Sequence, residues 1–205
     1  PRGHDLAALL EAIGPRTKLV YLANPNNPTG AWFGAQAFTD FLARVPQRVI
    51  VVVDEAYAEF VDAPDYASAL SLVARHPNLV VTRTFSKVYG LAGLRVGYAV
   101  ASPEVADLMN RVRQPFNVNN LALAAAVAAL DDHVFIAESY ELNRRGMEQV
   151  LDGLRRLGLE HIPSHGNFVT FAVPQGETGA SLNQKLLRQG VIVRPIGGYG
   201  LPNHL

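Results

Sequence analysis

A run of five consecutive β-branched residues, Val49 to Val53, constrains the fold more than any other feature of this sequence. Such a run is typical of a strand that is apolar on both faces, inside a parallel sheet with helices on both sides. Apolar runs at 19–22, 79–81 and 96–100 repeat the pattern, with helical or loop stretches between them. The alternation predicts an α/β fold with a three-layer, mainly parallel sheet.

Helical patterns surround these strands and dominate after residue 103. We expect a short helix capped by Asp5. Further helices are predicted at 36–44, 104–113, 121–130, 134–157 and 180–189, and further strands at 168–173 and 191–193. The change from alternating strands and helices to mainly helices predicts two domains. Residues 1–150 would form part of a large domain, and residues 151–205 part of a smaller α+β domain.

Composition excludes several classes of protein. The 18 basic residues offset the 18 acidic ones, so no overall field favours nucleic acid. The absence of cysteine excludes disulfides and thiolate chemistry and fits a reducing, cytoplasmic location. No apolar run approaches the roughly 20 residues of a membrane helix. Among six histidines, only His161 and His165 lie close together, and they flank Pro163, so no metal site is expected.

Polar residues that could bind a ligand or take part in catalysis follow the first three apolar runs. Asn27 follows the first run, Asp54 the second, and Ser86 and Lys87 the third. In an open parallel sheet the ligand crevice lies at the carboxyl ends of the strands. We therefore expect these side chains to converge, although they are far apart in the sequence.

The residue types suggest specific chemistry at this edge. Lys87 lies between hydroxyl residues and a glycine-containing loop, where partial desolvation would lower its pKa and let its amine form a Schiff base with a carbonyl. Arg95, with the hydroxyls of Thr84 and Ser86, could hold a phosphate. Asp54 should be partly buried and needs a cationic or hydrogen-bonding partner, although taken alone it could simply cap the next element.

Three segments resemble, in order, the signatures of fold-type I pyridoxal-phosphate aminotransferases. They are Asn24-Pro-Asn-Asn-Pro-Thr-Gly30, Asp54-Glu-Ala-Tyr57 and the segment from Thr84 to Gly97. Glu59-Phe60 and the segment 193–205 resemble the histidinol-phosphate aminotransferase branch of that family. One such motif is weak evidence, but three in order at family spacing are specific, and the resemblance covers essentially the whole chain.

The resemblance implies pyridoxal 5'-phosphate as cofactor and a catalytic group around it. Lys87 would form the Schiff base and carry the proton between substrate Cα and cofactor. Asp54 would pair with the pyridinium nitrogen, so that the ring acts as an electron sink. Asn27 and Tyr57 would hydrogen-bond the phenolic oxygen, although Tyr57 taken alone reads as a core residue. The Asn27–Pro28 bond is expected to be cis.

The resemblance also assigns binding roles. Thr84, Ser86 and Arg95 would hold the cofactor phosphate. Arg194 would contact the phosphate of the substrate, although it could equally be a surface arginine at a strand end, and Asn167 would face the site.

The reaction implied is amino transfer from glutamate to imidazole acetol phosphate, by a homodimer with small-molecule substrates, in histidine biosynthesis. Three alternatives stay open: a threonine-phosphate decarboxylase, an aminotransferase-like effector domain of a transcriptional regulator, and an inert structural fragment. Both ends, Pro1 and Leu205, read as cuts through a longer protein. Family elements expected upstream, and an arginine expected after Leu205, would then be missing, so we expect the 205 residues alone to be inactive.

Overall fold

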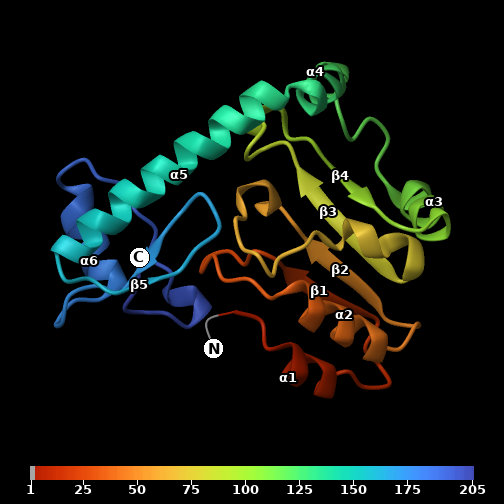
Figure 1. Ribbon diagram of the computed structural model, residues 1–205, viewed down its shortest axis with the longest axis horizontal. Coiled ribbons are helices and arrows are strands. Elements are labelled where there is room, and N and C mark those ends of the chain that lie inside the picture. The colour runs from red at the N-terminus through yellow and green to blue at the C-terminus, as the bar shows by residue number, and fades with distance from the viewer. Residues whose placement is uncertain (1–2) are drawn as a thin grey trace.

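The computed structural model describes residues 3–205, so Pro1 and Arg2, at the predicted cut, lie outside it. Its main element is a four-stranded sheet in the order β1–β2–β3–β4, formed by Leu19–Ala23, Ile50–Asp54, Leu79–Thr84 and Gly97–Val100. The first three strands are parallel and β4 is antiparallel to β3 (Figure 1). Residues 85–96 turn back without a full crossover helix, which allows the antiparallel return. The predicted α/β fold is confirmed.

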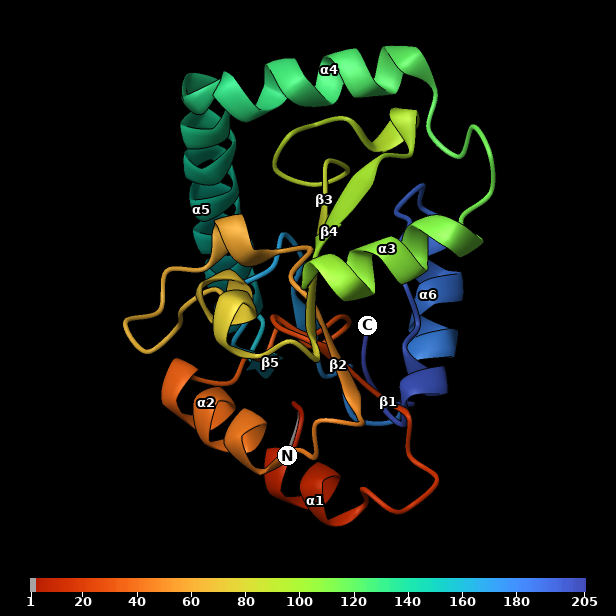
Figure 2. The ribbon, with the colours of Figure 1, turned by 90° about the vertical axis from the view of Figure 1, so that its right-hand side faces the viewer.

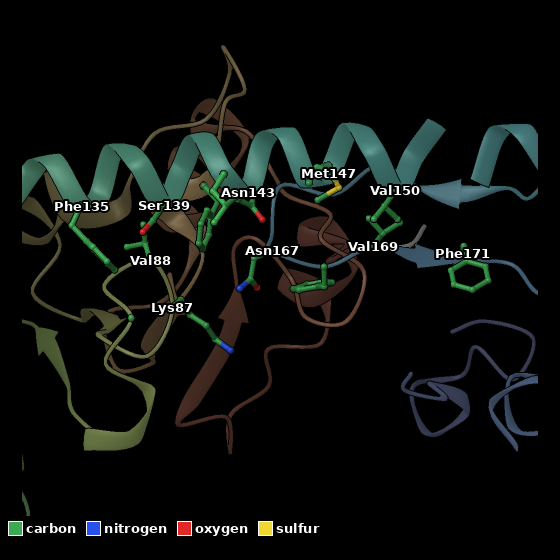
Figure 3. A pocket seen from close by; sticks show the side chains of 15 residues that line it. Lys87, Val88, Phe135, Ser139, Asn143, Met147, Val150, Asn167, Val169 and Phe171 are labelled. Atoms are coloured by element: carbon green, nitrogen blue, oxygen red, sulfur yellow. The ribbon is translucent and has the colours of Figure 1, made fainter. Parts of the chain in front are cut away.

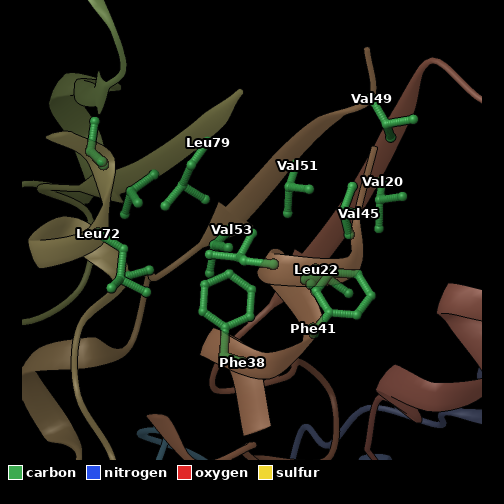
Figure 4. Packing of buried hydrophobic residues seen from close by; sticks show 14 residues of the cluster. Val20, Leu22, Phe38, Phe41, Val45, Val49, Val51, Val53, Leu72 and Leu79 are labelled. Atoms are coloured by element: carbon green, nitrogen blue, oxygen red, sulfur yellow. The ribbon is translucent and has the colours of Figure 1, made fainter. Parts of the chain in front are cut away.

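The hydrophobic core lies between the sheet and the helices on one of its faces. These helices are α1 (Leu6–Glu11), α2 (Ala35–Arg44) and the 3-10 helix η2 (Ala69–Arg75). Phe38 and Phe41 of α2 pack against the buried strand residues Val51 and Leu22 (Figure 4). The Asp5 side chain accepts a hydrogen bond from Ala8 N at 3.0 Å, as expected of an N-cap.

The other face of the sheet is open at β1. Leu19 and Tyr21 are 54% and 56% exposed there, while the alternate residues Val20 and Leu22 are buried. Strand side chains alternate between the two faces. The described residues therefore leave the Tyr21 face of β1 accessible, and this is the face on which Asp54 also lies.

Three helices lead from the sheet to a smaller unit. They are α3 (Pro103–Val112), α4 (Asn120–Asp131) and α5 (His133–Arg156), all close to their predicted bounds. Figures 1 and 2 show α4 and α5 at the end of the molecule opposite α1, with α5 running to the smaller unit. No single described helix is long and apolar enough to cross a membrane; α4 and α5 together pass that test, but with an 80° bend between them.

The smaller unit holds a two-stranded antiparallel sheet, β5 (His161–Ile162) and β6 (Thr170–Phe171), and helix α6 (Gly179–Leu187). The strand predicted at 168–173 is regular only over β6, and β5 is too short to leave a sequence pattern. The predicted boundary between residues 150 and 151 lies inside α5, and this division stays a prediction.

The strand predicted at 191–193 is wrong. This segment has no regular structure, and Ile192 is 84% exposed. The place beside β6 is taken by the last residues instead: Phe171 N donates to Leu205 O at 2.9 Å, and Leu205 N donates to Phe171 O at 3.1 Å. A β-branched run forms a strand only where a neighbour offers unpaired backbone groups.

Candidate functional site

The carboxyl ends of β1, β2 and β3 carry the predicted polar residues. Asn27 lies in the turn after β1, Asp54 ends β2, and Lys87 follows β3. The turn is braced by the buried Asn24, whose amide donates to Phe33 O at 3.2 Å and accepts from Phe33 N at 2.9 Å. The Asn27–Pro28 bond is cis, as expected, and Asn24–Pro25 is also cis.

Asn27, Tyr57 and Lys87 form the centre of the site. The Asn27 amide donates to the Tyr57 hydroxyl at 2.8 Å, and Lys87 Nζ lies 5.1 Å from the centroid of the Tyr57 ring. Tyr57 is 5% exposed and packs edge to face against Phe168. Its ring therefore packs in the core while its hydroxyl reaches Asn27, and its role toward a cofactor stays a prediction.

A cavity of about 330 Å³ opens at this group. Five predicted site residues line it, namely Asn27, Tyr57, Lys87, Asn167 and Arg194. Its other lining residues are mostly apolar, including Phe171 and Ile196. The structure thus brings Asn167 and Arg194 of the smaller unit to the same space as the lysine.

A second, larger cavity of about 590 Å³ adjoins the first beneath α5. It shares Lys87 and Asn167 with the smaller cavity, but its walls are largely apolar, as Met147 and Val150 illustrate (Figure 3). Figure 3 shows the Lys87 amine directed away from α5. The polar chemistry of the site therefore lies on the side of the smaller cavity.

Asp54, Thr84, Ser86 and Arg95 do not line either of these cavities. Asp54 Oδ1 accepts from Ala56 N at 3.1 Å, and Oδ2 accepts from the Tyr21 hydroxyl at 3.0 Å. Within residues 3–205 Asp54 forms no ion pair. The expected partners of this carboxylate are therefore hydrogen-bond donors, and no described side chain supplies a cation.

The residues predicted to hold a phosphate form one connected group. Arg95 Nη1 lies 3.4 Å from Ser86 Oγ, and Ser86 N donates to the Thr84 hydroxyl at 3.0 Å. Arg95 has a left-handed backbone with φ of 53°, which costs a residue with a Cβ roughly 1–2 kcal/mol. Strain of this kind clusters at functional sites, where the surrounding structure enforces it.

A buried ionic cluster next to Asp54 was missed by the sequence reasoning. Glu55 is 1% exposed, and its carboxylate accepts from Ala69 N at 2.6 Å, Ser68 Oγ at 2.8 Å and Arg83 Nε at 2.9 Å. Arg83 also pairs with Glu59 at 2.6 Å. We call these four side chains, Glu55, Glu59, Ser68 and Arg83, the Glu55 cluster.

The charged groups of the Glu55 cluster pair with one another. Burial disfavours the charged Arg83 guanidinium, but Glu55 and Glu59 outweigh that effect and raise its pKa. The one sequence signal was a charged residue, Arg83, two positions after the apolar run 79–81 and still within β3.

The smaller unit is fastened to the turn that carries Asn27. Thr170 Oγ1 donates to Pro28 O at 2.6 Å, and His165 N donates to Gly30 O at 3.1 Å. Gly30 has φ of 73°, and a Cβ there would lie 1.9 Å from Ser164 Oγ. Only glycine allows this approach. These contacts join the turn to the segment that supplies Asn167.

His165 reaches across the same junction. Its ring packs edge to face on Trp32 at 4.2 Å, and its Nδ1 accepts from Asp62 N at 3.4 Å. Burial lowers its pKa, while the charges of Asp62 and Asp65 act in the opposite direction. Burial against the indole therefore favours the neutral form of the ring.

Comparisons with known proteins identify the family of this chain. The chain matches the family described as "Aminotransferase class I and II" over residues 2–205. It is 64% identical over 203 residues to histidinol-phosphate aminotransferase 1 of Dechloromonas aromatica, a match that covers 99% of this chain and 55% of the relative. The chain thus spans about half the length of the curated relatives it matches.

Two solved structures give the same picture. A histidinol-phosphate aminotransferase from Sinorhizobium meliloti, in complex with pyridoxal-5'-phosphate, matches with a TM-score of 0.87 and 33% identity, over 94% of this chain and 53% of that one. An L-threonine-O-3-phosphate decarboxylase from Porphyromonas gingivalis matches with a TM-score of 0.83 and 26% identity, over 100% of this chain and 62% of that one.

Proposed function

The chain belongs to the class I and II aminotransferase family, and on that premise we propose that the protein containing it is a pyridoxal-phosphate-dependent histidinol-phosphate aminotransferase. It would move the amino group of glutamate to imidazole acetol phosphate, giving 2-oxoglutarate and histidinol phosphate. The observation that carries the proposal is the cavity in which Asn27, Tyr57 and Lys87 meet Arg194. A relative of that name at 64% identity supports the choice of substrate.

The donor set fits the cofactor group by group. Pyridoxal phosphate carries an aldehyde, a phenolic oxygen, a basic ring nitrogen and a phosphate. The described chain offers an amine at Lys87, the hydrogen-bonded pair of Asn27 and Tyr57, and a carboxylate without a cation at Asp54. The fourth counterpart is the group of Arg95, Ser86 and Thr84. When bound, the cofactor supplies an electron sink for the charge that develops at the substrate Cα.

Lys87 has two roles in this proposal. It is the only lysine among the described residues that line the cavity, and its amine would hold the cofactor aldehyde. Once the amino substrate takes that place, the freed Nζ would accept the proton from the substrate Cα and hold it for its return to the product. Its place over the Tyr57 ring keeps the amine directed toward this space.

The remaining groups hold protons and charges in place. Because the Tyr57 hydroxyl accepts from the Asn27 amide, its own proton is free to bond the phenolic oxygen. Asp54 would hold a proton on the ring nitrogen, and Arg95 would bind the phosphate with the nearby hydroxyls. These roles are assigned from geometry and chemistry together with the family resemblance.

Arg194 is proposed as the cation for the phosphate of the second substrate. It is exposed and shares the cavity with Lys87, next to the apolar residues Val193, Ile196 and Phe171. A guanidinium at this edge of the cavity could bind a phosphate through two hydrogen bonds. Asn167 lies between the two cavities and would orient the substrate by hydrogen bonding.

We also propose that the protein acts as a homodimer in the cytoplasm. Val112, Phe116 and Leu121, around α3 and α4, are 82%, 97% and 79% exposed. Helix α4 is apolar on all sides, a pattern typical of a buried helix. A second copy of the chain covering this surface would account for it, and a biosynthetic enzyme fits the location expected of a cysteine-free sequence.

The test is a direct assay of the natural polypeptide that contains these residues. With cofactor, it should form more than one equivalent of 2-oxoglutarate per active site from glutamate only when imidazole acetol phosphate is present. Release of carbon dioxide from threonine phosphate, without amino transfer, would identify the decarboxylase instead.

Arginine variants sharpen the assay. Arg194→Ala should raise the KM for the phosphorylated acceptor by about 10- to 100-fold, the loss of one charged contact, with little change in the KM for glutamate. Arg188→Ala, at the end of α6 and away from the cavity, is the matched control. Equal KM values in both variants would refute the role of Arg194.

A further inference from the structure

Tyr21 forms a contact that the proposed chemistry does not yet use. Its hydroxyl donates to Asp54 Oδ2 at 3.0 Å, from the open face of β1. In the sheet register, Ala23 pairs with Asp54 and Tyr21 pairs with Val52. Tyr21 and Asp54 therefore lie on the same face as diagonal neighbours, within reach of a long side chain.

This bond accounts for a polar group in an unusual place. A tyrosine on an exposed sheet face gains nothing from the core, yet here its phenol is aimed at the carboxylate that ends the neighbouring strand. Asp54 has only one other described hydrogen-bond donor, Ala56 N at 3.1 Å on Oδ1. One donor on each oxygen fixes the plane of the carboxylate and leaves a second lone pair on each oxygen for a ligand.

Resting on the proposed function, we propose that Tyr21 is a positioning residue that acts through Asp54 to keep a proton on the cofactor ring nitrogen. A proton shared between a carboxylate and a ring nitrogen resides on the stronger base. A hydrogen bond to the charged form of a carboxyl makes it the weaker base. The phenol of Tyr21 therefore biases the proton toward the nitrogen. Burial and the charge of Asp54 raise the pKa of this phenol, which favours its donor form.

The test uses the natural full-length protein loaded with pyridoxal phosphate labelled with ¹⁵N in the ring. The ¹⁵N chemical shift reports directly whether the ring nitrogen is protonated. In Tyr21→Phe the shift should move toward the neutral-pyridine value, because the carboxylate of Asp54 becomes the stronger base. In the parent the shift should indicate a protonated nitrogen.

The chain offers a matched control. Tyr140 on α5 is also hydrogen-bonded to an aspartate, Asp62, and it does not line either cavity that contains Lys87. Tyr140→Phe removes the same chemical group and should leave the ¹⁵N shift unchanged. A melting temperature for each variant separates a loss of fold from a change at the site.

Each outcome decides one question. An unchanged ¹⁵N shift in Tyr21→Phe overturns the inference, and so does a lower melting temperature with the same shift, because the role would then be purely structural. Equal movement of the shift in Tyr140→Phe also overturns it. Failure of the parent protein to bind pyridoxal phosphate refutes the proposed function itself, which is a separate result.

Discussion

Asp54 and Glu55 are consecutive carboxylates with opposite surroundings. Glu55 is 1% exposed, and its carboxylate accepts hydrogen bonds from Ser68 Oγ, Arg83 Nε and the backbone N of Ala69. Asp54 lies on the open face with two hydrogen bonds and no ion pair to a described residue. Successive residues of an extended chain point to opposite faces of the sheet. The carboxylate of Glu55 is therefore buried among its partners, while that of Asp54, one residue earlier, keeps bonding capacity on the other face.

The difference distinguishes stability from function. A buried charge is tolerable only when its partners satisfy it, and the Glu55 cluster meets that condition by itself. Groups that keep unused bonding capacity are suited to a ligand, as are Asp54 on the open face and Lys87 and the Tyr57 hydroxyl beside the cavity. The two carboxylates should therefore respond oppositely to the same amide substitution.

The largest effect is expected at the open carboxylate. Asp54→Asn keeps the shape but removes the charge that would hold the ring proton, so turnover of the loaded full-length enzyme should fall about 10³-fold, or about 4 kcal/mol in barrier. Its urea unfolding should stay close to that of the parent. Turnover within tenfold of the parent would show that Asp54 is not the ring partner.

The reverse result is expected one residue later. Glu55→Gln leaves Arg83 buried with one carboxylate fewer and should lower the free energy of unfolding by about 3 kcal/mol. Turnover of the protein that remains folded should stay within about threefold of the parent, a barrier change of less than about 1 kcal/mol. Urea titration and steady-state kinetics on the same preparation measure both quantities. A fall in turnover like that of Asp54→Asn, without loss of stability, would contradict the assignment of Glu55 to stability and Asp54 to function.

A pair of tyrosines repeats the comparison with a smaller effect. Tyr57→Phe removes the hydroxyl that accepts from Asn27, and turnover should fall by about tenfold. Tyr66 is set near the Glu55 cluster: its hydroxyl lies 3.4 Å from Asn24 O, and burial and the charge of Glu55 raise its pKa. Tyr66→Phe should cost about 1 kcal/mol of stability and leave turnover nearly unchanged. Similar kinetics in both variants would contradict the assignment.

The smallest effect concerns His165, which belongs neither to the Glu55 cluster nor to the residues proposed to bind the cofactor. Because its pKa is lower in the folded protein than its ordinary value of 6.5, the unfolded chain binds more protons between the two values. Stability should rise with pH through that window and stay level on either side of it, with a total change of less than about 1 kcal/mol because solvent screens the half-buried ring. His165→Gln should remove this component. Trp32 fluorescence, assigned by difference with Trp32→Phe, gives the midpoint, and a midpoint above the ordinary value would contradict the sign.

The positions of Asn27, Asp54 and Lys87 could be predicted because each follows a strongly patterned run, and a parallel sheet gathers such ends at one edge. The pairing of Glu55 with Arg83 could not, since a contact between residues far apart in sequence leaves no local pattern. Tyr21 was hidden for a related reason. It sits inside an apolar run and reads as core until the register shows which face it occupies.

The central claim is that the residues at the carboxyl ends of the strands bind the cofactor, with Lys87 as its covalent partner. Covalent trapping tests this claim most directly. Lys87 is one of three lysines in the sequence, with Lys18 and Lys185 as internal controls. Borohydride reduction of the loaded full-length protein, followed by peptide mapping, should place the cofactor on Lys87 alone, and Lys87→Arg should carry none. Cofactor found on another lysine, with Lys87 unmodified, would contradict the assignment of the site.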